Sequence, residues 1–257
     1  MIHPSSVISP DVVMGEGCEI GPFCVVGPGV VMGARNILRN HVTLEGPSSI
    51  GSDNVFFPGC AVGTQPQDLK YAGEPTTLTM GDRNIVRECV TINRGTVGGG
   101  GHTTVGTGCL FMLAAHVAHD CHVGDGVIMA NSATLAGHVT VGEFASIGGL
   151  TPVHQFVRIG PHAFIGGATR VSQDIVPFIK MGGIPPTILG ANSVGLLRRG
   201  FDKRAVEAID TAVKILFKSG LNTTQGVEKI KASLPAIPEI AAIISFVETS
   251  QRGILRG

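Results

Sequence analysis

The feature of this sequence that most restricts its fold is an aliphatic residue at every sixth position. The first run of this pattern begins at Ile2 and reaches Val62 with eleven members in register, and after a break it continues to Val171. A period of six matches neither a helix, with a period of about 3.6, nor an amphipathic strand, with a period of two. It matches a parallel β-helix, in which each hexad supplies one strand and one corner and three hexads close a triangular coil.

The positions of the hexad differ in composition. The second position is often glycine and the fifth is small, so we expect the first position to fill the coil and the fifth to turn inward where space is limited. Each buried first-position side chain should contribute about 1.5–3 kcal/mol. Five of the six cysteines occupy fifth positions and are interpreted as buried apolar side chains, not disulfide partners or metal ligands: Cys18, Cys24, Cys60, Cys109 and Cys121.

A cluster of polar residues lies within the apolar repeat without breaking its period of six. The stretch AAHVAHDCHVG, residues 114–124, contains His116, His119, Asp120 and His122. Successive coils stack at about 4.8 Å, so residues eighteen apart lie one above the other. Gly137 follows His119 by eighteen residues, which places this glycine directly above the histidine. A scaffold of glycine, valine and isoleucine has little chemistry of its own, so the cluster is the candidate site.

The period breaks twice, near residues 66–78 and 94–104. In the first gap Asp68 and Glu74 occupy would-be inward positions, so this segment must leave the coil. The second gap reads NRGTVGGGGHTT, whose glycines permit several backbone paths, and it is compatible with a flexible flap or an inert spacer. External loops on a closed coil commonly build sites or subunit contacts.

The composition changes after Pro185 and Pro186, which we expect to block any return to helix or coil until about Asn192. Beyond this point apolar residues recur at spacings of three and four, which is typical of helices. We therefore predict a mainly β protein: a parallel β-helix domain over residues 1–185, then an α-helical domain of three or four helices over residues 190–257. Whether the helices cap the coil or pack beside it stays open.

The charge balance excludes some partners. With 19 basic and 19 acidic residues the formal net charge is +0, so no broad field attracts nucleic acid or an anionic membrane. The N-terminus lacks a basic segment followed by an apolar run, and no stretch approaches the ~18 apolar residues of a membrane-spanning helix. We expect a cytoplasmic protein.

Five segments in order carry a resemblance to a known family. They are the hexapeptide coils, QPQDLKYAGEPT, HVAHDCHVGDGVIMANSATLAGHVTVG, GGLTPVHQFVRIG and NSVGLLRRGF. Together they resemble the UDP-N-acetylglucosamine 3-O-acyltransferase family of lipid A biosynthesis, from residue 1 to the end. The resemblance implies a left-handed coil that transfers an (R)-3-hydroxyacyl chain from acyl carrier protein to the sugar 3-hydroxyl, without a covalent acyl-enzyme. It implies no cofactor beyond the phosphopantetheine of the carrier protein. Because flat sides of such coils pack in threes, we also predict a homotrimer.

The resemblance also implies roles for individual residues. His119 is expected to be the general base, Asp120 the carboxylate that supports its imidazolium, and Gly137 the backbone N–H donor to the oxyanion. Binding positions for the substrate are Asp68, Lys70, His116, His138, His154, Gln155, Asn192, Arg198 and Arg199. Gly149 and Gly167 are expected to line an acyl-chain groove for a chain of about fourteen carbons, by analogy with the family.

The sequence departs from the family pattern at two positions. Val194 replaces a glutamate and Asn93 replaces a histidine, so the uridine contacts are expected to differ in detail. A related subgroup acylates a 3-amino sugar, and that acceptor stays an alternative. The basic residues Arg198 and Arg199 are interpreted as functional, whereas Lys203 and Arg204 are equally compatible with an ordinary solvated helix face.

Two other functions compete with acyl transfer. A zinc-dependent hydratase would use His116, His119 and His122 as ligands, but their spacing of three and three puts neighbours on different sides of a corner. We therefore expect no metal. A non-catalytic β-helix would not need the histidine cluster. His122 and His162 belong to no motif and are interpreted as surface or structural residues.

Overall fold

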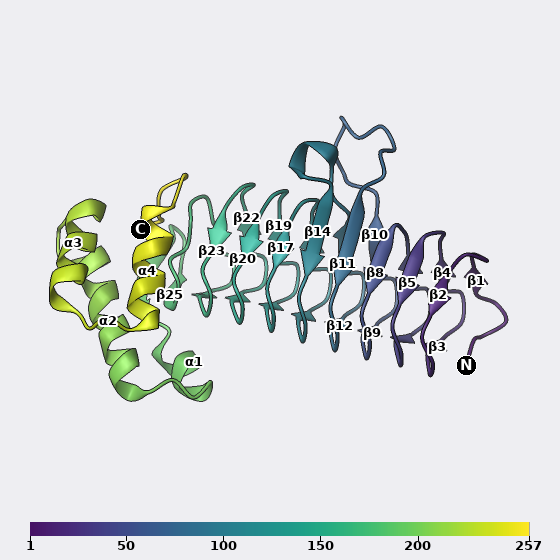
Figure 1. Ribbon diagram of the computed structural model, residues 1–257, viewed down its shortest axis with the longest axis horizontal. Helices are drawn as coiled ribbons and strands as arrows, with labels where there is room; N and C mark the ends of the chain where they lie inside the picture. Colours follow the sequence, from purple (N-terminus) through teal and green to yellow (C-terminus); the bar gives the residue numbers. More distant parts are fainter. Residues whose placement is uncertain (257) are drawn as a thin grey trace.

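The computed structural model describes residues 1–256 and contains a parallel β-helix followed by four helices (Figure 1). Three sheets form the sides of the coil, and strands three apart in sequence are neighbours in each sheet. The first sheet contains β1 (Val7–Ile8), β4 (Val25–Val26), β7 (Thr43–Leu44), β10 (Ala61–Thr64), β13 (Thr91–Asn93), β16 (His116–Val117), β19 (Thr134–Leu135) and β22 (Pro152–Val153). The second contains β2 (Val13–Met14), β5 (Val30–Met32), β8 (Ser48–Ile50), β11 (Thr77–Met80), β14 (His102–Val105), β17 (His122–Val123), β20 (Thr140–Val141) and β23 (Arg158–Ile159). The third contains β3 (Glu19–Ile20), β6 (Ile37–Leu38), β9 (Val55–Phe56), β12 (Ile85–Val86), β15 (Leu110–Phe111), β18 (Ile128–Met129), β21 (Ser146–Ile147), β24 (Phe164–Ile165), β25 (Ile179–Gly182) and β26 (Thr187–Ala191).

The eighteen-residue stacking rule holds through the regular part of the coil. Val117 pairs with Leu135, and Leu135 with Val153, and all three are at most 2% exposed. The five fifth-position cysteines are buried as free thiols, whereas Cys89 is exposed. Burial raises the pKa of the Cys60 and Cys121 thiols to about 12, which keeps these sulfurs neutral in the core.

Asparagines at fifth positions form a buried ladder along one corner of the coil. The side-chain amide of Asn54 donates to Asn36 Oδ1 at 3.0 Å, and that of Asn84 donates to Asn54 Oδ1 at 3.0 Å. The backbone N–H of Asn84 also donates to Asn54 Oδ1 at 2.9 Å. The amides thus satisfy buried polar groups where the chain turns.

Replacing Asn54 with alanine should therefore remove the acceptor of two buried N–H donors. We expect the free energy of unfolding to fall by about 2–3 kcal/mol, since a buried unsatisfied donor costs about 1–3 kcal/mol. Urea unfolding would measure the change, with exposed Asn131→Ala as the control, expected to lie within about 0.5 kcal/mol of the parent. Equal stability of the two variants would show that the ladder contributes little.

Two segments leave the coil at neighbouring positions. The first runs from residue 65 to 76, between β10 and β11, and the second from 94 to 101, between β13 and β14. Both project from the same side of the coil (Figure 1). The Arg94 guanidinium donates to Tyr71 Oη at 3.0 Å and so ties the second segment to the first. β11 begins at Thr77 and β14 at His102, inside the two segments where the period of six breaks, and the two strands pair in parallel.

The C-terminal helices lie beyond the last coil (Figure 1). They are α1 (Ser193–Arg198), α2 (Lys203–Lys218), α3 (Thr223–Ser233) and α4 (Pro238–Glu248). Their buried apolar side chains join those of the coil in one hydrophobic core, so the helices cap its C-terminal end. No helix within residues 1–256 has the length and apolar character needed to cross a membrane.

The parallel coil ends before the two prolines and the next helix begins at Ser193, as expected, but the segment between them forms a strand. Pro185 and Pro186 lie in the turn between β25 and β26, which pair antiparallel. A proline lacks an N–H donor but is tolerated in a turn, and β26 begins directly after it at Thr187. The last strand of the coil therefore has a hairpin partner that leads into α1.

Candidate active site

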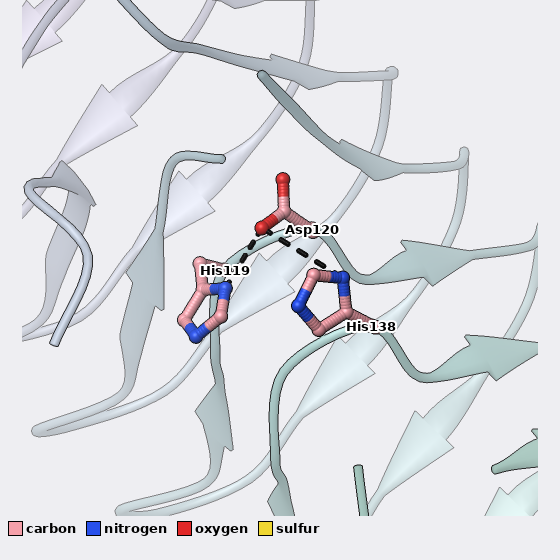
Figure 2. A group of neighbouring side chains, drawn as sticks. All are labelled: His119, Asp120 and His138. Atoms are coloured by element: carbon pink, nitrogen blue, oxygen red, sulfur yellow. Dashed lines mark hydrogen bonds and ion pairs between the residues drawn. The ribbon is translucent and has the colours of Figure 1, made fainter. Parts of the chain in front are cut away.

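A histidine and an aspartate form a hydrogen-bonded pair on the corner between β16 and β17. His119 Nδ1 lies 2.8 Å from Asp120 Oδ2, and the two side chains are 15% and 1% exposed. Figure 2 shows His138 on the other side of the same carboxylate, with its Nδ1 3.9 Å from Asp120 Oδ2. An anionic Asp120 accepts the Nδ1 proton of His119, which leaves His119 Nε2 as a proton acceptor.

Asp120 is buried beneath the second external loop. Its side chain does leave the coil interior, but the second loop covers it, so the residue is only 2% exposed. Thr96 donates its hydroxyl to Oδ2 at 2.6 Å and its backbone N–H to Oδ1 at 2.9 Å. Burial raises the pKa of the Asp120 carboxyl, but the hydrogen bonds from Thr96 and His119 and the nearby His138 outweigh it. The pKa is lowered overall, and Asp120 is a carboxylate at neutral pH.

Gly137 leaves room for the His119 ring. A Cβ at Gly137 would lie 2.5 Å from His119 Cε1 and 2.8 Å from Nε2, closer than real side chains approach. The Gly137 carbonyl accepts from Phe156 N–H at 3.2 Å, whereas its own N–H donates to no backbone acceptor within residues 1–256. The site therefore combines a basic nitrogen with an unused backbone donor one coil away.

His138 joins this pair to the first external loop. Its ring stacks on Phe156 with centroids 4.4 Å apart, and it meets the His119 ring edge-on at 5.1 Å. Burial lowers the pKa of His138 despite the charge of Asp120, so the ring is neutral at pH 7. A depression of about 370 Å³ is lined by Asp68, Lys70, Tyr71, Glu74, Thr96, Val97, Gly98, His138 and Phe156. The structure thus brings together three residues predicted from sequence: Asp68, Lys70 and His138.

The other two histidines of the cluster point elsewhere. His116 Nδ1 bonds to Thr91 Oγ1 at 2.7 Å, and exposed His122 bonds to Thr104 Oγ1 at 2.9 Å. Burial, followed by the charge of His119, lowers the pKa of His116. Within residues 1–256, the one set of three possible metal-binding side chains whose ligand atoms converge is His119, Asp120 and His138. The zinc site built from His116, His119 and His122 is therefore wrong.

A second hollow lies where the coil meets α1. It encloses about 690 Å³ and is lined by Phe144, Ser146, His162, Phe164, Lys180, Ala191, Asn192, Ser193, Val194, Gly195, Arg198 and Arg199. The guanidinium carbon of Arg199 lies 4.1 Å from the Phe144 ring centroid, and Lys180 Nζ lies 5.7 Å from that of Phe164. Cations beside aromatic rings suit a ligand that is both anionic and aromatic. The predicted Asn192, Arg198 and Arg199 meet here.

His162 was missed as a site residue. It is 7% exposed and lines the second hollow, where its ring stacks on Phe178 and lies tilted against Phe144. Burial, followed by the charge of Arg199, lowers its pKa. The signal was present in the sequence, because His162 follows Phe144 by eighteen residues. The same spacing joins His138 to Phe156 in the smaller hollow, and Phe23 to His41 outside both hollows.

The remaining predicted residues lie outside both hollows. His154 and Gln155 are exposed, and His154 Nδ1 lies 3.3 Å from an Arg252 guanidinium nitrogen. A Cβ on Gly167 would lie 3.1 Å from Gly149 O, so these glycines stack as a strip without side chains. Exposed Leu150 borders the strip, at 70% exposure.

Known proteins match this chain along its whole length. The family model described as UDP N-acetylglucosamine O-acyltransferase, domain 2, matches residues 174–255, and the six-repeat bacterial transferase hexapeptide model matches residues 11–46. The chain is 46% identical over 255 residues, 99% of each chain, to an acyl-[acyl-carrier-protein]–UDP-N-acetylglucosamine O-acyltransferase from Thermodesulfovibrio yellowstonii. It also resembles solved UDP-N-acetylglucosamine acyltransferases from Bacteroides fragilis (42% identity, all of both chains, TM-score 0.97) and Francisella novicida (36% identity, 100% of this chain and 94% of that one, TM-score 0.96).

Proposed function

The chain belongs to the acyl-[acyl-carrier-protein]–UDP-N-acetylglucosamine O-acyltransferase family, and from this premise we propose the reaction and the residues that perform it. The protein is an acyltransferase of lipid A biosynthesis, which moves an (R)-3-hydroxyacyl chain from acyl carrier protein to the 3-hydroxyl of UDP-N-acetylglucosamine. The observation that carries the proposal is the His119–Asp120 pair, whose free nitrogen lies against Gly137.

We propose a direct transfer in which His119 Nε2 takes the proton of the sugar 3-hydroxyl. The oxygen attacks the thioester carbonyl, and the Gly137 N–H donates to the oxyanion that forms. Asp120 stabilises the imidazolium through Nδ1–H. When the intermediate collapses, the C–S bond breaks and the leaving phosphopantetheine sulfur takes the proton from His119. No side chain is acylated in this scheme.

The acceptor binds in a cleft between two subunits in this proposal. His138 of the smaller hollow follows β19, whereas Phe144 of the larger hollow follows β20, so we place the smaller hollow of one subunit beside the larger hollow of its neighbour. Asp68, Lys70 and His138 hold the sugar, and His116, His154 and Gln155 are proposed to reach it from outside the hollows. The uridine diphosphate enters the larger hollow, where Asn192, Arg198 and Arg199 supply an amide and two cations. Val194 offers no carboxylate to the uridine, so the rings of Phe144 and His162 carry more of that contact.

We propose a homotrimer as the active assembly. Apolar side chains are exposed on strands of the coil, which supports packing of its flat sides against other subunits. They include Val7, Val13, Val25, Val31, Ile85 and Phe164.

We assign different roles to the two domains. The coil, residues 1–185, performs the reaction. The helical region, residues 190–257, binds the nucleotide, and the positive charge of Arg198 and Arg199 also attracts the acidic acyl carrier protein.

The strip at Gly149 and Gly167 predicts the length of the acyl chain. Without side chains to block it, the strip accommodates a long chain, so turnover should be fastest near about fourteen carbons, by analogy with the family. Initial rates with acyl carrier protein thioesters of graded length would measure this preference. A clear preference for a ten-carbon chain would contradict the assignment of the strip.

The proposed reaction is tested by incubating purified protein with UDP-N-acetylglucosamine and (R)-3-hydroxyacyl carrier protein. Mass spectrometry should detect the acylated UDP-sugar, and intact-protein spectra should show no acyl adduct on the enzyme. Absence of acylated sugar, or a stable acyl-enzyme, would contradict the proposal. Light scattering of the same sample tests the trimer independently.

A further inference from the structure

Thr96 is the hydrogen-bond partner that holds both oxygens of the Asp120 carboxylate. It lies in the second external loop, just before the short 3₁₀ turn Val97–Gly99, and is 7% exposed. Its hydroxyl donates to Oδ2, which also accepts from His119, and its N–H donates to Oδ1. On the other side, the Asp120 N–H donates to Thr103 Oγ1 at 2.8 Å. The carboxylate therefore accepts hydrogen bonds from Thr96 and His119, and Thr103 holds the backbone of the same residue.

The glycines of this loop shape it around the carboxylate. A Cβ at Gly99 would collide with the Asp120 carboxyl group, and one at Gly95 would lie 2.8 Å from Asp120 Oδ1. The Thr96 carbonyl accepts from the N–H groups of Gly99 at 3.0 Å and Gly101 at 2.7 Å, which closes the loop on itself. The segment is thus neither a free flap nor an inert spacer.

We propose that Thr96 is a positioning residue for acyl transfer, which keeps the Asp120 carboxylate ionised and aligned with His119 Nδ1. This inference rests on the proposed function, because it concerns the base of that reaction. Burial alone would favour a neutral carboxyl group, and the Thr96 donors are the first of the contacts that oppose it. A misaligned or protonated Asp120 no longer stabilises the imidazolium when His119 takes the proton.

The decisive comparison is between Thr96→Val and Thr96→Ser. Valine preserves the shape but removes the hydroxyl donor, so we expect kcat to fall about ten- to a hundredfold, the effect of losing a hydrogen bond to a charged group. KM for UDP-N-acetylglucosamine should change less than about threefold, because Thr96 acts through Asp120. Serine restores the donor and should bring kcat back to within about threefold of the parent.

The pKa of Asp120 itself separates positioning from a structural role. Losing the hydroxyl removes a donor that lowers the pKa of this carboxyl group, so the pKa should rise in Thr96→Val and stay in place in Thr96→Ser. NMR titration of the carboxyl carbons would measure it. Thr76→Val is the matched control, because Thr76 is buried and its hydroxyl bonds to nothing within residues 1–256. That variant should leave the pKa of Asp120 unchanged.

A double-mutant cycle with Asp120→Asn completes the test and remains informative even if Thr96→Val is less stable. If Thr96 acts through the carboxylate, Thr96→Val should lower kcat less than about twofold in the Asp120→Asn background. Equal losses in both backgrounds, an unchanged pKa of Asp120 in Thr96→Val, or no rescue by serine would overturn the inference. Failure of the proposed function would look different, because the parent enzyme would then form no acylated sugar.

Discussion

Replacing His119 with alanine is expected to lower kcat by about a hundred- to ten-thousandfold, the usual contribution of a general base. The side chain lies on a corner outside the coil interior, so its loss should not unfold the protein. The sugar hydroxyl would then lose the nitrogen whose protonated form Asp120 stabilises, while the Gly137 N–H would remain. Steady-state rates with UDP-N-acetylglucosamine and a hydroxyacyl carrier protein would measure the loss, and circular dichroism would confirm the folded coil.

His122→Ala is the matched control for this experiment. His122 comes three residues after His119, is exposed, and bonds to Thr104 away from the depression. Its replacement should leave kcat within about twofold, as expected for a surface residue with no part in the site. Retained activity in His119→Ala, or an equal loss in His122→Ala, would contradict the assignment of the base.

Replacing Gly137 with alanine should have the second largest effect on catalysis. The new Cβ would overlap the His119 ring, so either the ring or the next coil must move. Since the same residue supplies the oxyanion donor in our scheme, we expect kcat to fall about a hundred- to a thousandfold. Affinity for UDP-N-acetylglucosamine, measured by calorimetry, should fall much less. A fully active Gly137→Ala enzyme would show that the position of the His119 ring does not control the rate.

The period of the sequence was sufficient to predict the coil and its stacking. It placed Gly137 beside His119, because parallel strands stack without offset and side chains eighteen apart meet. It could also have revealed His162, since this histidine continues the column that begins at Phe144. A rule that aligns residues between coils identifies contacts within the repeat.

The contacts made by the aperiodic segments could not be predicted in the same way. The glycine-rich second loop has no repeat to fix its path, so the sequence did not indicate that Thr96 would reach Asp120 or that this aspartate would be buried. Likewise, β26 depends on pairing antiparallel with β25 after the proline turn, and the six-residue period says nothing about this pairing. These features result from tertiary contacts between segments with no common period.

The most direct test of the central claim is a competition between two acceptors. UDP-N-acetylglucosamine and its 3-amino analogue would be offered together with one hydroxyacyl carrier protein, and both acylated products would be quantified by mass spectrometry for the parent and for His119→Ala. We predict that the parent acylates the 3-hydroxyl at least as efficiently as the 3-amino group, and that His119→Ala loses the ester product. Exclusive formation of the amide by the parent, or unchanged ester formation by His119→Ala, would contradict the claim that His119 activates a sugar hydroxyl.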